Sequence, residues 1–301
     1  MKLPALIACG LLSLAGCQRT VRPQTAFDGQ AAIEYARTQL AFGPRVPGTA
    51  GATRCGDWII AQMRQRADTV IVQSWSYTTV GGTVLPLRNV LARFRPTATD
   101  RVLYVTHWDT RPTSDEARDS AQRRIPVPGA NDGAAGVGLF VALGDVLKKA
   151  PPAVGVDLLL VDGEDYGDFP KMQDVLLGST YFAAHLPEPG YHPLYGVLWD
   201  MIGDRDLGIY EEGNSLLRAP EVVQRVWARA ADLGYQRYFV PQVKYTVTDD
   251  HLPLIKAGLR VIDVIDLDYP PHHTPEDTID KISARSLQIV GDVATALVSG
   301  D

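Results

Sequence analysis

The sequence predicts a single α/β domain, in which a mixed, mainly parallel sheet is sandwiched between helices. Short apolar runs typical of strands alternate with stretches of roughly 10–17 residues that have helical spacing. The run at 156–161 is apolar except at Asp157, as expected for a strand buried on both faces. No internal repeat or long linker divides the chain, and its 46% hydrophobic residues suffice for one large core.

The elements follow one another in the order that such a domain requires. A helix is predicted at 28–40, with Asp28 able to cap its start, and a second at 53–65. Strand-like runs are predicted at 69–77, 87–94, 102–106, 156–161, 194–199 and 259–265. Further helices are predicted at 133–148, 179–184, 220–233 and 284–298.

The charge of the chain excludes one class of partner. The formal net charge is −6, and no run of Lys and Arg is present that could follow a phosphate backbone. We therefore expect no nucleic-acid partner. The acidity is better explained by solubility and by a cluster of carboxylates with a chemical role.

Acidic and imidazole side chains gather where the predicted strands end, which is where open α/β sheets place their sites. These residues are His107 and Asp109 after 102–106, Asp162, Glu164 and Asp165 after 156–161, Asp200 after 194–199, and His272, His273, Glu276 and Asp277 after 259–265. Asn131 and Asp132 lie in a Gly-rich loop that opens a helix. Any one of these residues alone would be an ordinary cap or turn former, but together they predict a site.

Oxygen and imidazole ligands brought from separate strands suit zinc with an open coordination position. The adjacent pair Glu164-Asp165 is useful for such a centre, because one carboxylate can hold the metal while its free neighbour moves protons. We therefore predict a Zn²⁺ cofactor. Asp109 is expected to orient His107 rather than to bind metal.

Several motifs, in order along 42–282, resemble the M28 zinc peptidase superfamily and, within it, the glutaminyl cyclase branch. The motifs shared with the superfamily are His107-Trp108-Asp109-Thr110-Arg111-Pro112, Gly129 to Gly133, Glu164-Asp165, Asp200 to Gly203 and His273-Thr274. The motifs closest to the cyclase branch are Phe42-Gly43-Pro44-Arg45-Val46-Pro47-Gly48, Pro86 to Val90 and Asp249-Asp250-His251. The resemblance implies a zinc-exopeptidase-like fold.

The cyclase resemblance also implies roles for individual residues. One zinc would be bound by Asp132, Asp165 and His273, and would polarise the side-chain carbonyl of an N-terminal glutamine. Glu164 would carry a proton from the attacking amine to the leaving ammonia, while Asp200 and Asp250 would steady the reacting amide. The branch further implies a cis peptide bond after Asp132. His251 either orients Asp250 or is a structural histidine.

The chain departs from the cyclase pattern at two positions, and an alternative activity remains open. Asp165 stands where many cyclases have Glu, and His272 stands where animal cyclases have a Trp that lines the glutamine pocket. His107 and Asp200 match the residues that bind a second zinc in aminopeptidase relatives. If this chain bound two ions in the same way, Asp132 would bridge them. The alternatives to a cyclotransferase are therefore a two-zinc aminopeptidase and an inactive binding module of the cell envelope. Either enzyme would act on peptide or protein N-termini.

The N-terminus has the pattern of an export signal. Met1 and Lys2 precede an apolar run that is too short to span a bilayer of ~30 Å. The ending Leu14-Ala15-Gly16-Cys17 resembles the lipobox of bacterial lipoproteins, in which the cysteine is acylated. We therefore expect 1–17 to be a lipoprotein signal, 18–27 a tether and 28–301 the zinc-dependent catalytic domain. The expected location is the bacterial cell envelope, most simply the periplasmic face of the outer membrane, with secretion as the alternative.

The cysteines fit this organisation. Cys9 lies within the expected signal and Cys17 would be acylated, so Cys55 is left without an intrachain partner. It lies on a predicted helix among apolar residues. We therefore expect Cys55 to be a buried structural thiol, and contact with a membrane to be made only through the lipid anchor.

Overall fold

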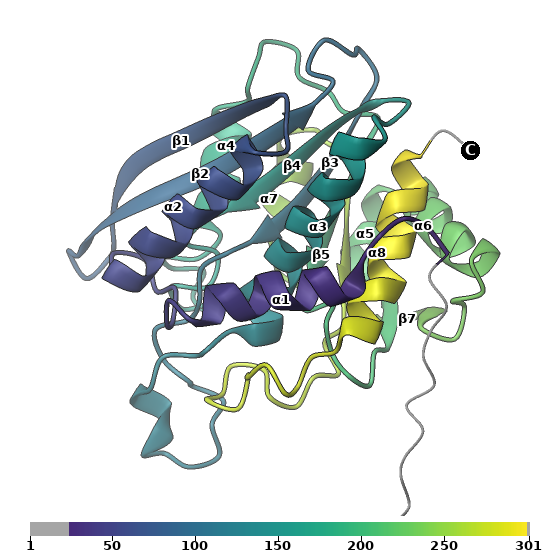
Figure 1. Ribbon diagram of the computed structural model, residues 1–301. Coiled ribbons are helices and arrows are strands. Elements are labelled where there is room, and N and C mark those ends of the chain that lie inside the picture. The colour runs from purple at the N-terminus through teal and green to yellow at the C-terminus, as the bar shows by residue number, and fades with distance from the viewer. Residues whose placement is uncertain (1–23, 300–301) are drawn as a thin grey trace, which may run out of the picture.

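The computed structural model describes residues 24–299, whose centre is a six-stranded sheet (Figure 1). The strand order is β1-β2-β4-β3-β5-β8. Strands β3, β4, β5 and β8 run parallel, while β1 and β2 join one edge in antiparallel pairing. The bounds are β1 Thr69–Thr78, β2 Val84–Phe94, β3 Arg101–His107, β4 Gly155–Val161, β5 Tyr195–Asp200 and β8 Val261–Ile265. The predicted mixed, mainly parallel sheet is thus confirmed.

Helices cover both faces of this sheet. One layer contains α1, α2, α3 and α8, and the opposite layer contains α4 and α7 (Figure 1). Helices α5 and α6, together with a small parallel sheet of β6 and β7, lie beyond the β8 side. The helix bounds are α1 Gly29–Leu40, α2 Ala50–Arg64, α3 Gly136–Lys149, α4 Leu177–Ala184, α5 Gly213–Arg218, α6 Pro220–Asp232, α7 His251–Lys256 and α8 Ala284–Val298, and the small sheet is formed by β6 Ile209–Glu212 and β7 Phe239–Tyr245.

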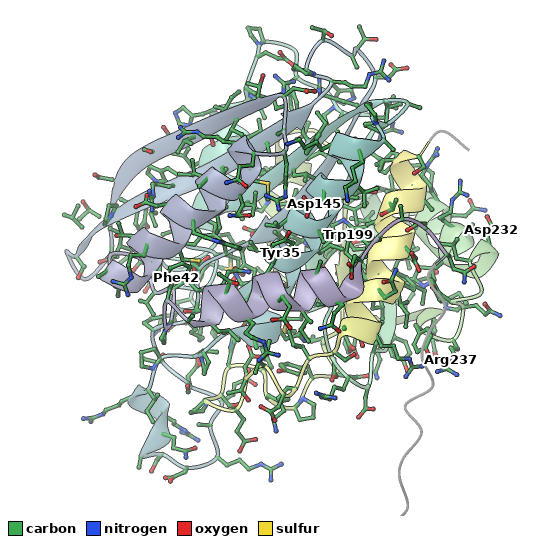
Figure 2. All side chains as sticks on the ribbon, viewed as in Figure 1. Tyr35, Phe42, Asp145, Trp199, Asp232 and Arg237 are labelled. Carbon is green, nitrogen blue, oxygen red and sulfur yellow. The ribbon has the colours of Figure 1, made fainter. Side chains whose placement is uncertain are left out.

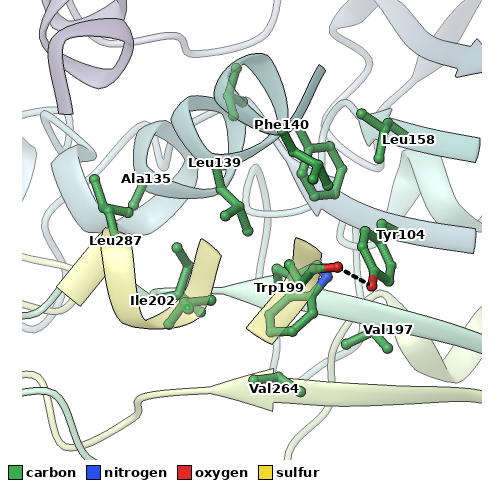
Figure 3. Packing of buried hydrophobic residues seen from close by; sticks show 14 of the residues in the cluster. Tyr104, Ala135, Leu139, Phe140, Leu158, Val197, Trp199, Ile202, Val264 and Leu287 are labelled. Atoms are coloured by element: carbon green, nitrogen blue, oxygen red, sulfur yellow. Dashed lines mark hydrogen bonds between the residues drawn. The ribbon is translucent and has the colours of Figure 1, made fainter. Parts of the chain in front are cut away.

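Successive side chains of the central strands point to opposite faces of the sheet, and an apolar core lies on each face. Tyr104 and Trp199 point to the layer of α3 and α8, where they meet at a ring-centroid distance of 5.5 Å (Figure 3). Their strand neighbours Leu103 and Leu198 point to the other face, into the core beneath α4 and α7. Because successive side chains of a strand alternate between faces, a strand apolar at nearly every position is buried on both sides.

Helix α3 and the short helical segment before it form the most apolar stretch of the described chain. By length and composition Ala130–Lys149 could cross a membrane, but 94% of its most apolar window is buried inside the domain. This burial is typical of the core helix of a globular protein. The expected signal at 1–17 and most of the expected tether lie outside the described residues.

The first described residues are bound to the domain. The Asp292 carboxylate of α8 accepts hydrogen bonds from the backbone NH groups of Gln24 and Thr25, both at 3.0 Å. Phe27 is buried, and its ring occupies the space where a side chain at Gly291 would lie. The packed domain therefore includes residues 24–27, which the sequence had assigned to the tether.

A buried ion-pair network crosses the sheet at Asp157 on β4. Its two carboxylate oxygens accept from Arg93 Nε at 3.1 Å and from Arg101 Nε at 2.8 Å. The hydroxyl of Tyr191 donates to the same carboxylate at 2.8 Å. Asp157 is fully buried, and the two arginine side chains are only 6% and 4% exposed. The Asp157 carboxylate is therefore shared by two cations that have almost no access to water, and Arg93 also pairs with Glu188 at 2.9 Å.

We expect Asp157→Asn to lower the free energy of unfolding by about 3–5 kcal/mol, because removing one partner of a buried ion pair leaves uncompensated buried charge. Urea denaturation measures this change. The matched control is Asp57→Asn, since Asp57 is 64% exposed and pairs with Arg88 at the surface. This control should cost at most about 1 kcal/mol. Equal losses for the two variants would contradict the assigned role of Asp157.

Candidate functional site

The site lies at the carboxyl ends of the parallel strands, which share one edge of the sheet. His107 ends β3 and Asp200 ends β5, while Glu164 and Asp165 follow β4 directly. His273 comes from the long loop after β8. Parallel pairing therefore brings these residues together without any proximity in sequence, as expected for an open α/β sheet.

Asp132, Asp165 and His273 meet at one point. His273 Nε2 lies 3.7 Å from Asp132 Oδ2 and 3.4 Å from Asp165 Oδ1, and one potential ligand atom from each residue lies within 4.8 Å of the others. The Oδ2 atoms of both aspartates are buried without a hydrogen-bond partner. Buried carboxylate oxygens without a donor are costly, and a cation removes that cost. Two carboxylates and one imidazole are also a donor set suited to zinc, so these residues fit the metal.

A second set shares Asp132. His107 Nε2 lies 3.0 Å from Asp132 Oδ1 and 3.1 Å from Asp200 Oδ1. Burial disfavours a positive charge on His107, but Asp200, Asp109 and Asp132 outweigh it and raise the imidazole pKa well above its usual value. The surroundings of His107 therefore favour a positive charge, which a proton or a metal ion can supply.

Charged groups around the first set orient its ligands. Arg111 Nη1 donates to Asp165 Oδ1 at 2.6 Å, and the same guanidinium binds both oxygens of Asp115. His273 Nδ1 faces Asp115 and Glu116 at 3.8 and 3.7 Å, which leaves Nε2 directed at Asp132 and Asp165. Burial and the neighbouring His272 lower the pKa of His273 to about 3, so the imidazole is neutral, as a metal ligand must be. The sequence reasoning had assigned no role to Arg111, Asp115 or Glu116.

Two further aspartates hold the backbone of the site. Asp109 accepts hydrogen bonds from the NH groups of Glu164 at 3.0 Å and of Asp165 at 3.2 Å. Its Oδ1 lies 3.6 Å from His107 Nδ1, so it also faces that ring, as expected. The side chain of Asp277 accepts from the NH groups of Asn131 and Asp132. The turns that present the ligands are therefore fixed by buried carboxylates.

The cis peptide bond expected after Asp132 is not found, and that prediction was wrong. Residues 24–299 contain no cis peptide bond. The chain turns instead through Gly133, whose φ of 98° lies in the region that favours glycine. A Cβ at this position would lie 2.7 Å from the Asp109 carbonyl oxygen, so the turn has no room for a side chain.

Arg45, from the motif at 42–48, is buried behind the site. Its guanidinium donates to the carbonyl oxygens of Trp108 at 3.3 Å, Pro128 at 2.6 Å, Gly129 at 2.6 Å and Asp132 at 3.4 Å. One side chain thereby joins the end of β3 to the loop that carries Asp132. The motif at 42–48 thus supplies a structural tie and no group that faces the pocket.

A pocket of about 380 Å³ opens over these residues. Its walls include Asp132, Glu164, Asp200 and His273, and a further acidic group, Asp249. Burial raises the pKa of Glu164 well above its usual value, and the charges of Asp165, Asp249 and Asp250 act in the same direction against His107. Burial and the charges of Asp200 and Asp250 likewise raise the pKa of Asp249. The pocket therefore contains two carboxyl groups, Glu164 and Asp249, whose pKa values are raised above those of ordinary carboxylic acids.

Asp249 lies on the pocket wall, and its neighbour Asp250 lies behind that wall. Asp250 does not line the pocket but is fully buried, and its Oδ1 accepts a 2.5 Å hydrogen bond from Ser179. His251 points away toward Glu212 at 3.4 Å and Asp263 at 4.0 Å, which favours the structural alternative for this histidine. The two aspartates are adjacent in the sequence, and only one of them faces the pocket. A sequence motif does not show which one it is.

His272 forms part of the pocket mouth. Its ring stacks on His273 at a centroid distance of 3.6 Å, and its Nδ1 lies 3.3 Å from the exposed Glu116 carboxylate. Among residues 24–299, Glu116, His272 and His273 form a third group of side chains with metal-ligand spacing. His272 therefore contributes a polar wall at the position where animal cyclases have a Trp.

Comparisons with known proteins agree with this arrangement. The profile of Peptidase family M28 matches residues 89–298. The solved glutaminyl cyclase of Bacteroides thetaiotaomicron is 32% identical, with a TM-score of 0.88 over 91% of this chain and 98% of that one. A leucine aminopeptidase precursor from the same species is also 32% identical, with a TM-score of 0.88 over 94% and 99%.

A curated relative, Aminopeptidase YwaD of Bacillus subtilis, is 26% identical over 212 residues, which are 65% of this chain and 40% of that protein. The chain thus spans less than half of that relative's length. The family match covers more than half of the chain, and the side chains that meet at the sheet edge have the spacing of metal ligands. The chain therefore belongs to peptidase family M28 and is a zinc-dependent enzyme.

Proposed function

We propose that the protein is a glutaminyl-peptide cyclotransferase, which converts the N-terminal glutamine of peptides into pyroglutamate and releases ammonia. The observation that carries the proposal is that Glu164, Asp200 and Asp249 line one pocket beside the three-residue zinc set. Cyclisation consumes no water. Its main requirement is that protons move between the attacking amine and the leaving nitrogen, which carboxyl groups of raised pKa can perform.

The pocket has places for both ends of a glutamine residue. Zinc held by Asp132, Asp165 and His273 would supply a Lewis acid for the side-chain carbonyl. Ile265 and Leu267 line the wall that would contact the methylene groups. The acidic side of the pocket then receives the substrate's α-amine, since a cationic or neutral amine is attracted to Glu164 and its neighbours.

Glu164 is the proton carrier in this scheme. As the α-nitrogen bonds to the side-chain carbonyl carbon, Glu164 accepts the proton that this nitrogen loses. As the bond from that carbon to the side-chain nitrogen breaks, Glu164 returns the proton, and ammonia leaves. Asp200 and Asp249 accept hydrogen bonds from the reacting amide and hold it in line. The carboxylate ends in the state in which it began.

The alternative two-zinc aminopeptidase would use His107, Asp132 and Asp200 for a second ion, and these side chains have suitable spacing. Asp249 favours the cyclotransferase. Burial and the charges of Asp200 and Asp250 raise its pKa, and its side chain lines the pocket together with Asp200. In the cyclotransferase scheme both carboxyl groups bind the reacting amide, so Asp200 serves as a hydrogen-bond acceptor rather than as a metal ligand.

Product analysis and metal counting test the proposal. We expect about one zinc per chain, ammonia release from Gln-initiated peptides, and no cleavage of Leu- or Ala-initiated peptides. His107→Ala should keep the zinc if one ion is bound, and should remove one of two ions in an aminopeptidase. Two zincs with release of free N-terminal amino acids would establish the aminopeptidase instead. Neither product from a zinc-loaded protein would favour the binding module.

We further propose that Cys17 is acylated and anchors the domain to the cell envelope, on the basis of Leu14-Ala15-Gly16-Cys17. Cys17→Ala should prevent lipidation and leave the protein unprocessed or mislocalised. Mass spectrometry of the mature N-terminus measures this directly. An unmodified N-terminal residue other than Cys17 in the wild-type protein would disprove the anchor.

A further inference from the structure

Two arginines converge on one tyrosine outside the zinc pocket. Arg237, after α6, and Arg285, in the first turn of α8, both donate to the Tyr238 hydroxyl. Their guanidinium carbons lie 4.4 and 5.4 Å from the centre of the Tyr238 ring. Within residues 24–299 neither arginine has a carboxylate at ion-pair distance. Two adjacent cations without an anion repel each other, so this place favours an external negative group.

The same face carries a third arginine on an aromatic ring. The guanidinium of Arg225 on α6 lies 5.1 Å from the centre of the Tyr195 ring. The Tyr195 hydroxyl donates to the Leu297 carbonyl near the end of α8, whereas Arg285 lies at its start. The arginine–tyrosine pairs therefore extend along the whole of α8. Arg237 and Asp232 can be located on this side of the molecule in Figure 2.

Opposing charge on α6 itself is sparse. Glu221 on α6 already pairs with Arg260 at 3.1 Å, which leaves Asp232 at the end of α6 as the exposed acid of that helix. The whole chain has a formal net charge of −6, so a positive face is a local reversal of the general charge. None of these residues lines the zinc pocket.

The chain enters the domain on this face. Asp292, in the middle of α8, binds the NH groups of Gln24 and Thr25, and it also accepts from the Tyr235 hydroxyl. The rings of Tyr235 and Tyr238 lie 6.4 Å apart, so the entry point is next to the arginine pair. In Figure 1 the N-terminal segment passes beside α8 with α6 on the same side.

Six residues, 18–23, separate Cys17 from Gln24, and they include Arg19 and Arg22. Seven peptide units span at most ~25 Å at about 3.3–3.6 Å per residue. If Cys17 carries the proposed anchor, the α6–α8 face is therefore held within roughly 25 Å of the bilayer. Arginine and tyrosine are the side chains suited to such a surface, because arginine attracts anionic headgroups and tyrosine favours the membrane–water interface.

We propose that the face formed by Arg225, Arg237, Arg285 and Tyr238 docks onto an anionic lipid bilayer. It is a second membrane contact, weak alone, that orients the enzyme when the acylated Cys17 holds it at the surface. The pocket residues stay clear of this face, so peptides can still reach the zinc centre. The proposal uses the anchor for proximity, but the charge of the face can be tested without any lipid on the protein.

The test is vesicle co-sedimentation of the zinc-loaded, unacylated chain that begins at Gln18. The vesicles contain phosphatidylcholine alone or an equal mixture with phosphatidylglycerol. We expect binding to the mixed vesicles only, which weakens as salt is raised. Because one arginine near such a surface is worth roughly fivefold in affinity, the double variant Arg237→Gln/Arg285→Gln should bind roughly 25-fold more weakly.

The matched control is Arg54→Gln/Arg64→Gln, which removes the same charge from exposed positions of α2. This control should bind like the unaltered chain, and all three proteins should have the same turnover and thermal midpoint. No binding to the mixed vesicles, equal binding to phosphatidylcholine alone, or equal losses in the two double variants would overturn the proposal. Turnover is measured in the same samples, so failure of docking is distinguishable from failure of the proposed activity.

Discussion

Replacing Glu164 by Gln is expected to keep the zinc and to lower turnover by roughly 10²–10⁴-fold, the usual contribution of a positioned acid–base group. Glu164 is not a member of the three-residue sets with metal-ligand spacing, yet it lines the pocket that contains them. Glutamine keeps the size of the side chain but cannot accept or return a proton. Glu164→Gln should therefore lower turnover and leave the metal content unchanged.

Metal analysis and steady-state kinetics on Gln-initiated peptides measure the two quantities separately. The matched control is Glu116→Gln, because Glu116 lies on the same pocket but is 55% exposed and faces only the outer Nδ1 atoms of His272 and His273. A Glu164→Gln protein that loses its zinc would make Glu164 a ligand. A comparable loss in Glu116→Gln would show that the effect is a general change of pocket charge.

The second large effect is expected for His273→Ala, which should lose the zinc together with the stability that zinc provides. His273 supplies the only imidazole of the Asp132, Asp165 and His273 set. A ligand present at 1,000 times its dissociation constant stabilises the folded state by about 4 kcal/mol. Without His273 the two carboxylates hold the ion far more weakly, so that stabilisation disappears at the same zinc concentration.

Thermal unfolding with and without a chelator measures this difference. The midpoint of the unaltered protein should fall when zinc is removed, and that of His273→Ala should not respond. His272→Ala is a close control, since the two rings stack on each other but His272 turns toward Glu116. Loss of zinc in His272→Ala, or a normal zinc content in His273→Ala, would contradict the ligand assignment.

Sequence motifs did not show which residues hold the proposed metal ligands in position. Arg111 stands in the quoted run after His107, but only the tertiary structure shows that it donates to Asp165, which lies 54 residues away. Arg45 was recognised as part of a motif, and its four carbonyl acceptors became visible only in the fold. Contacts of this kind depend on side-chain direction, which a motif does not encode.

The sheet, its helical layers and the residues that meet at its edge followed from the sequence alone. Apolar runs of strand length alternate with helical spacing, and in a parallel sheet the residues that follow the strands must share an edge. That rule predicts that His107, Glu164, Asp165 and Asp200 lie together. The small sheet of β6 and β7 was not predicted, since its strands are short and β7 is largely exposed.

Tertiary structure decided what depends on the direction of single backbone units. It placed Asp249 rather than Asp250 on the pocket wall, and it turned the chain after Asp132 through a positive φ at Gly133 without a cis peptide bond. Periodicity reports which residues are buried over a turn of helix or along a strand. In an irregular loop there is no period, so neighbouring side chains can point in opposite directions, and only the packing around them determines which one faces the substrate.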